Sequence, residues 1–72
     1  MKTILVFRTS VSNKGRVKNL TPYLDRLINE NGRWNFDLED CDNILRVETE
    51  RPDVVAISNL LRKQGYVCEE LH

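Results

Sequence analysis

The sequence predicts a single α+β domain in which two helices cover one face of a four-stranded antiparallel sheet. Three observations lead to this prediction. Two segments have apolar residues at helical spacing, shorter segments have the composition or two-residue period of strands, and Gly, Asn and Pro separate them. With 72 residues the chain can build one small core but not a second domain.

The composition is that of an ordinary globular protein. Eleven basic residues balance eleven acidic residues, so no strong net charge attracts the chain to nucleic acid or to an anionic membrane. The apolar run over residues 4–7 is too short for a signal-peptide core or a membrane span. The two cysteines lie far apart in the sequence, which fits a reducing compartment, and we expect a cytoplasmic protein.

The first strand and the first helix are expected in the N-terminal half. Residues 3–9 are rich in β-branched and apolar side chains and predict a strand, and residues 9–15 predict a loop. The next apolar residues recur at spacings of three, four and three, which is one face of a helix: Val17, Leu20, Leu24 and Leu27.

Pro22 lies inside this helical pattern and leaves two interpretations open. The helix begins at Thr21 and Pro22, or it begins near Asn13 and Pro22 kinks it. We favour a helix with an irregular first turn. The pair Asn31-Gly32 is typical of a left-handed helix end and predicts where this helix stops.

A hairpin is expected in the middle of the chain. Apolar and polar residues alternate over 34–38 and again over 45–49, which predicts two half-buried strands. The polar stretch 40–43 predicts the turn that joins them.

A second helix and a last strand complete the chain. Pro52 suits the first position of a helix, and Asp53 suits the positive end of its dipole. Gly65 suits the end of this helix. The buried face of this helix is expected to consist of Val54, Ile57, Leu60 and Leu61. The last strand is expected to open at residues 66–68.

The resulting order of elements is β-α-β-β-α-β, for which the known compact arrangement is the ferredoxin-like sandwich. In this topology three connections meet at one end of the sheet: residues 9–15, 40–43 and 63–65. A site shared by distant parts of the sequence would form there.

Several segments resemble the heavy-metal-associated (HMA) domain of copper chaperones and metal-transport ATPases, over nearly the whole chain. The segments that carry the resemblance are Val17-x-x-Leu20-x-x-x-Leu24-x-x-Leu27 with its Thr21-Pro22, Trp34-x-x-Asp37, Ile44-Leu45-Arg46-Val47-Glu48 and Lys63-x-Gly65-Tyr66. In that family a Cys-x-x-Cys at the start of the first helix holds Cu(I), because soft thiolates suit a soft ion.

This chain lacks that pair of cysteines. Aligned at Val17, Asn13 and Arg16 stand at the two positions, and neither an amide nor a guanidinium can replace a thiolate. We therefore expect an HMA-like member without a cofactor that binds an unidentified protein partner or acts in regulation. The expected partner-binding residues are Ser12, Asn13, Lys14, Arg16, Lys18 and Lys63.

Cys41 leaves an alternative open. It lies in the predicted turn beside Asp40 and Asp42, where one thiolate and carboxylates would form a weak site for Cu or Zn. A metallochaperone of this kind would use Cys41 or collect thiolates across a dimer. Cys68 is expected to be a buried, inert thiol.

Other functions are not expected. His72 is the only histidine and the last residue, so no catalytic Cys-His or Ser-His-Asp set can be assembled, and we expect no enzyme. The outer face of the sheet should carry a small apolar patch of Ile4, Val6 and Ile44, sufficient for a weak homodimer. The strand over 44–49 has no aromatic residue to stack on a base, so we expect no nucleic acid partner.

Overall fold

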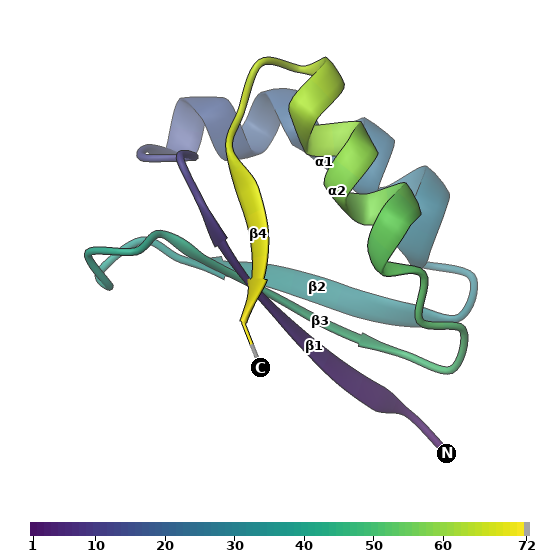
Figure 1. The fold of residues 1–72 in the computed structure, drawn as a ribbon. Coiled ribbons are helices and arrows are strands. Elements are labelled where there is room, and N and C mark those ends of the chain that lie inside the picture. Colours follow the sequence, from purple (N-terminus) through teal and green to yellow (C-terminus); the bar gives the residue numbers. More distant parts are fainter. Residues whose placement is uncertain (72) are drawn as a thin grey trace.

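The computed structural model describes residues 1–71, so His72 lies outside the described residues. The elements follow the predicted order: β1 (Thr3–Thr9), α1 (Lys14–Ile28), β2 (Gly32–Asp37), β3 (Ile44–Thr49), α2 (Val54–Lys63) and β4 (Cys68–Leu71). The strands form one antiparallel sheet in the order β2-β3-β1-β4, and both helices cover the same face (Figure 1). The predicted α+β arrangement is confirmed, and its strand order is consistent with a ferredoxin-like fold.

The core lies between the sheet and the two helices. On the central pair of strands, Leu5 lies opposite Val47 and Phe7 opposite Leu45, and all four side chains are buried. Since successive strand residues point to opposite faces, the residues between them face away from the helices. No helix among residues 1–71 is long and apolar enough to cross a membrane.

Helix α1 begins directly after Asn13, which caps it, and continues through Pro22. The Asn13 Oδ1 atom accepts a hydrogen bond from the Arg16 N–H at 2.9 Å, which satisfies one free N–H of the first turn. Of the two interpretations, the start near Asn13 is therefore the correct one. The Thr21 hydroxyl donates to the Val17 carbonyl at 2.9 Å, one turn back, just before the proline.

The buried face of α1 differs from the prediction at its C-terminal end. Leu20 and Leu24 are buried as predicted, but Ile28, not Leu27, completes the stripe. Leu27 is 41 % exposed and lines a groove between the two helices. Leu27 and Ile28 follow Leu24 by three and by four residues, and both spacings fit one face of a helix. Only the position of the sheet decides which of the two side chains is buried.

The prediction of a left-handed helix end at Asn31-Gly32 is wrong. Helix α1 ends at Ile28, and among residues 1–71 only Asn43 and Gly65 have positive φ. Gly32 is instead the first residue of β2. A Cβ atom there would overlap the Glu48 carbonyl oxygen and lie 2.7 Å from the Thr49 Cα, so glycine is needed for close backbone approach.

Helix α2 ends at the predicted glycine but begins two residues later than predicted, since Val54 and not Pro52 is its first residue. The Asp53 carboxylate caps the helix by accepting a hydrogen bond from the Ala56 N–H at 3.0 Å. Gly65, with φ of 90°, closes the other end, and the Tyr66 N–H donates to the Leu61 carbonyl at 3.0 Å. The predicted buried face of α2 is confirmed: Ile57 and Leu61 are buried, and Val54 and Leu60 are partly buried. Ser58 is also buried.

Candidate functional site

Three connections meet at one end of the sheet, as predicted. The Thr9 hydroxyl donates to the Asn43 carbonyl at 2.7 Å, and the Thr9 N–H donates to the Asp42 carbonyl at 3.1 Å. On the other side, the Val67 N–H donates to the Ser10 hydroxyl at 2.8 Å, and the Ser10 N–H donates to the Val67 carbonyl at 3.2 Å. The loop after β1 is thereby fastened both to the β2–β3 turn and to the segment before β4.

The start of α1 is a capped helix end with exposed polar side chains. The Asn13 side chain is occupied by its hydrogen bond to the Arg16 N–H. Ser12 is exposed, and so are the three cations of this segment: Lys14, Arg16 and Lys18. This end of α1 contains no acidic residue in its first turn, so the positive end of the helix dipole and the basic side chains add together.

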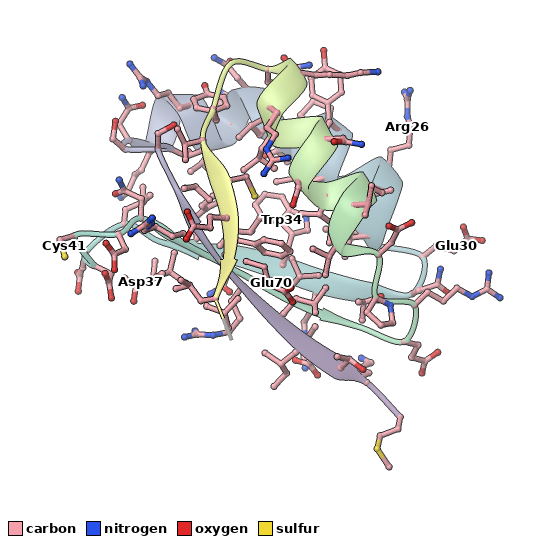
Figure 2. The ribbon with its side chains drawn as sticks, in the orientation of Figure 1. Arg26, Glu30, Trp34, Asp37, Cys41 and Glu70 are labelled. Atoms are coloured by element: carbon pink, nitrogen blue, oxygen red, sulfur yellow. The ribbon has the colours of Figure 1, made fainter. Side chains whose placement is uncertain are left out.

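The turn around Cys41 is held by its own backbone and carboxylates. The Asp40 Oδ1 atom accepts from the Asp42 N–H at 2.8 Å, and the Asn43 N–H donates to the Asp40 carbonyl at 3.0 Å. One possible ligand atom each from Asp40, Cys41 and Asp42 lies within 4.8 Å of the others, and all three residues are exposed. Figure 2 shows Cys41 at the tip of this connection, pointing away from the sheet.

Cys68 cannot add a second thiolate to this turn. It is 2 % exposed, and its Sγ lies 4.0 Å from the Ser58 hydroxyl oxygen, to which it donates. Burial raises the pKa of the Cys68 thiol above its ordinary value, and the hydrogen bond to Ser58 and the Arg62 charge offset only part of that effect. The thiol is therefore buried, as the sequence predicts, and it is kept in its neutral form.

Two of the three predicted partner-binding lysines, Lys14 and Lys63, line separate hollows. Lys14 lines a hollow of about 470 Å³ between α1 and β2. Lys63 lines a groove of about 400 Å³ between α1 and α2, together with Tyr23 and Leu27. The neighbouring Arg62 donates a hydrogen bond to the Cys68 carbonyl at 3.1 Å. Lys14 and Lys63 therefore lie on different surfaces of the molecule.

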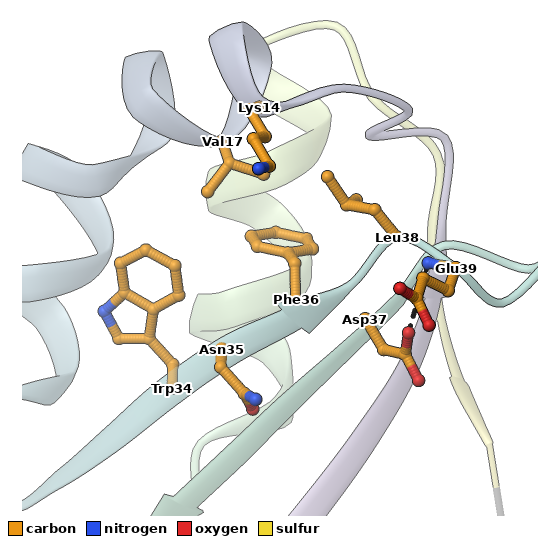
Figure 3. A pocket seen from close by; sticks show the side chains of 8 residues that line it. All are labelled: Lys14, Val17, Trp34, Asn35, Phe36, Asp37, Leu38 and Glu39. Atoms are coloured by element: carbon orange, nitrogen blue, oxygen red, sulfur yellow. Dashed lines mark hydrogen bonds between the residues drawn. The ribbon is translucent and has the colours of Figure 1, made fainter.

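The hollow beside β2 is a feature that the sequence analysis does not identify. Trp34 and Phe36 project toward α1, with ring centroids 5.8 Å apart and an interplanar angle of 78°, and Asn35 and Asp37 point the opposite way (Figure 3). The Trp34 Nε1–H donates to the Asp25 carboxylate at 3.0 Å. The alternation of residues 34–38 predicts the face of these side chains, but the edge position of β2 leaves them only half-buried.

The outer face of the sheet carries less apolar surface than predicted. Ile4 is 61 % exposed and Val6 is half-buried, but Ile44 is 8 % exposed. Ile44 lies opposite Arg8 in the ladder, and Val6 lies opposite Arg46. The prediction that Ile44 joins an exposed patch is therefore wrong, because long charged side chains stand beside the apolar ones on this face.

Comparisons of the chain with models of protein families, with curated proteins and with solved structures gave no match.

Proposed function

We propose that the chain is an HMA-like protein-binding or regulatory module that does not carry Cu(I) at the start of its first helix. The observation that carries this proposal is the cap of α1. The Asn13 side chain already accepts the hydrogen bond from the Arg16 N–H at 2.9 Å, and the Arg16 guanidinium places a permanent cation in the same turn. A metal cation would meet no thiolate here and would be repelled.

The chemistry of this helix start favours an acidic partner. Lys14, Arg16 and Lys18 are exposed, and the positive end of the α1 dipole adds to their charge. A partner with a carboxylate-rich surface would approach this end faster and in a preferred orientation. The bonds of Thr9 and Ser10 to the neighbouring connections hold the preceding loop in place for such a contact.

The alternative is a metallochaperone that binds Cu or Zn through Cys41 or across a dimer. The observation in its favour is the close placement of possible ligand atoms from Asp40, Cys41 and Asp42. A single thiolate with two exposed carboxylates is a poor match for Cu(I) and an incomplete one for Zn(II), which takes four ligands in structural sites. This function therefore needs further ligands from a second chain.

An anaerobic titration separates the two functions. The reduced protein is titrated with Cu(I) and with Zn(II) against a chromophoric chelator, beside the Cys41→Ser variant. The proposal expects neither protein to compete with the chelator. Competition by the unaltered protein that disappears in Cys41→Ser would overturn the proposal and favour the metallochaperone.

A second experiment tests the helix start as the binding surface. Partners retained by the unaltered chain are compared with those retained by the double variant Lys14→Ala/Arg16→Ala. The matched control, Lys2→Ala/Arg51→Ala, removes the same charge from exposed residues at the opposite end of the sheet. We expect a partner that is lost with the first variant and kept with the control. A partner set that is identical for all three proteins would contradict the proposal.

A further inference from the structure

The free edge of β2 is a row of unpaired backbone groups. β2 and β4 are the two outer strands, with six residues in β2 and four in β4. The Glu50 N–H donates to the Asn31 carbonyl at 2.9 Å, which makes these residues a hydrogen-bonded pair at the end of the β2–β3 ladder. Hydrogen-bonded and non-hydrogen-bonded pairs alternate along an antiparallel ladder. The residues of the non-hydrogen-bonded pairs therefore direct their N–H and C=O groups away from β3, to the free edge: Gly32, Trp34 and Phe36.

The sequence of β2 does not protect this edge against a further strand. Natural edge strands are blunted by proline, by a bulge, by an inward-pointing charge, by charged side chains (lysine above all) or by short length. β2 has no proline, no lysine, no bulge in its ladder with β3 and no inward-pointing charge. It does carry two charged side chains on its solvent face, Arg33 and Asp37, but they are of opposite sign, so a strand with complementary charges can still pair with it. The strand is therefore able to pair with a strand from another chain.

An apolar hollow lies beside the same edge. It has a volume of about 470 Å³, and its apolar lining comes from α1 and β2 and from the residue after β2: Val17, Trp34, Phe36 and Leu38 (Figure 3). A strand added to β2 would direct every second side chain toward the helices and so toward this hollow. An aromatic side chain at such a position would cover the exposed parts of Trp34 and Phe36.

The charges on the solvent face of β2 complement a second copy of the same strand. With two copies antiparallel and Asn35 opposite itself on the two-fold axis, Arg33 of each copy lies opposite Asp37 of the other. In this register Trp34 pairs with Phe36 of the second copy, which uses the free backbone groups of both. Moving the axis to Trp34 or to Phe36 would place Asp37 opposite an asparagine. The axis at Phe36 would also bring Arg33 opposite Glu39, but Glu39 lies beyond the end of β2, so only the axis at Asn35 pairs both charges within the strand.

We propose that β2 is a homodimerisation edge, at which two copies of the chain pair antiparallel about Asn35 and join their sheets into one. The second copy is the occupant because the Arg33–Asp37 match occurs twice by symmetry. Within each copy the Arg33 Nε lies 3.4 Å from a Glu48 carboxylate oxygen, so the new pair extends an existing row of alternating charges. This surface is separate from the helix start proposed above, and either can fail without the other.

Sedimentation of charge variants tests the proposal. The unaltered chain should form a dimer whose fraction rises with concentration. Arg33→Asp and Asp37→Arg should each weaken the dimer about ten-fold, because each change replaces two attractive cross-strand pairs by two repulsive ones. An equimolar mixture of the two variants should recover the dimer, since one copy then presents two acidic and the other two basic side chains. Recovery also shows that both variants fold.

One control variant and two possible results complete this test of the dimer. Lys2→Asp changes the net charge in the same way as Arg33→Asp, but at an exposed residue before β1, and should leave the dimer unchanged. A chain that is monomeric at every concentration would overturn the proposal and leave this edge to a strand of a different protein. A dimer that responds to neither Arg33→Asp nor Asp37→Arg would also overturn it.

A cross-link tests the register itself. In the Cys41→Ser background, Asn35→Cys should form a covalent dimer on treatment with oxidised glutathione, which takes up the two electrons released by the thiols. The two Cα atoms would lie about 4.5 Å apart in a non-hydrogen-bonded pair, within reach of a disulfide. Arg33→Cys in the same background should not cross-link, because the two positions would lie about 13 Å apart along the strands. Equal cross-linking of both variants would reject the register.

Discussion

The indole Nε1–H of Trp34 donates a hydrogen bond to the Asp25 carboxylate at 3.0 Å, and this contact joins the edge strand β2 to the C-terminal part of α1. Trp34 belongs to an outer strand, which among residues 1–71 pairs with β3 alone. The bond therefore adds a specific attachment to the helix layer on the side where β2 has no second strand. It also orients the indole along the hollow that α1 and β2 enclose.

Loss of this bond should weaken the fold by an amount typical of one part-buried hydrogen bond. Trp34→Phe removes the donor and leaves the Asp25 carboxylate without it, and we expect the free energy of unfolding to fall by about 1–3 kcal/mol. Asp25→Asn keeps an acceptor oxygen and should cost less. Urea denaturation measures both, with Tyr23→Phe on the exposed side of α1 as the control. Equal stability of Trp34→Phe and the control would contradict this role.

Gly32 should be the least replaceable glycine of the chain. Gly32→Ala would drive a Cβ atom into the backbone of Glu48 and Thr49, so that β2 must move away from β3. We expect a loss of more than about 2 kcal/mol in the free energy of unfolding, as for other overpacked sites. The comparison is Gly65→Ala, where φ is 90° but the space is open, and where about 1 kcal/mol is expected. Thermal unfolding of the two variants should rank them in this order, and the reverse order would refute the steric explanation.

The cap of α1 should respond to side-chain chemistry and not to size. Asn13→Ala removes the acceptor of the Arg16 N–H and should lower the free energy of unfolding by about 1 kcal/mol. Asn13→Ser and Asn13→Asp retain a capping oxygen and should stay close to the unaltered chain. Asp53→Ala, at the cap of α2, provides an independent measure of the same effect. If Asn13→Ser were as unstable as Asn13→Ala, the cap would not be the cause.

Stability at alkaline pH should depend on Cys68. Because the folded state holds the pKa of this thiol above its ordinary value, the folded chain keeps a proton that the unfolded chain releases. The stabilisation is complete below the ordinary thiol pKa and is lost as the pH rises through the folded-state pKa. In the Cys41→Ser background, the free energy of unfolding should fall more steeply with pH than in Cys41→Ser/Cys68→Ser. Parallel curves for the two proteins would exclude this effect.

The order of elements followed from local patterns in the sequence. The helix start near Asn13 and the helix end at Gly65 are as predicted, since capping and left-handed turns depend on a few neighbouring residues. The helix end that was predicted wrongly, at Asn31-Gly32, depends on residues far away in the sequence. The pair Asn31-Gly32 is typical of a helix end, but Gly32 instead allows the backbone of β2 to lie close to Glu48 in β3. Only the pairing of the two strands reveals this contact.

The sequence by itself determined the α+β class, the order of the elements, the absence of a cysteine pair at the start of α1 and the place of Cys41 in the turn between β2 and β3. These are properties of residue type and of short-range periodicity. Only the tertiary structure decided that β2 is an edge strand and that Ile28 replaces Leu27 in the core. Only it separated Lys14 and Lys63 into different hollows. The physical reason is that burial and strand pairing depend on which elements lie side by side, and helical or alternating spacing carries no record of the neighbour.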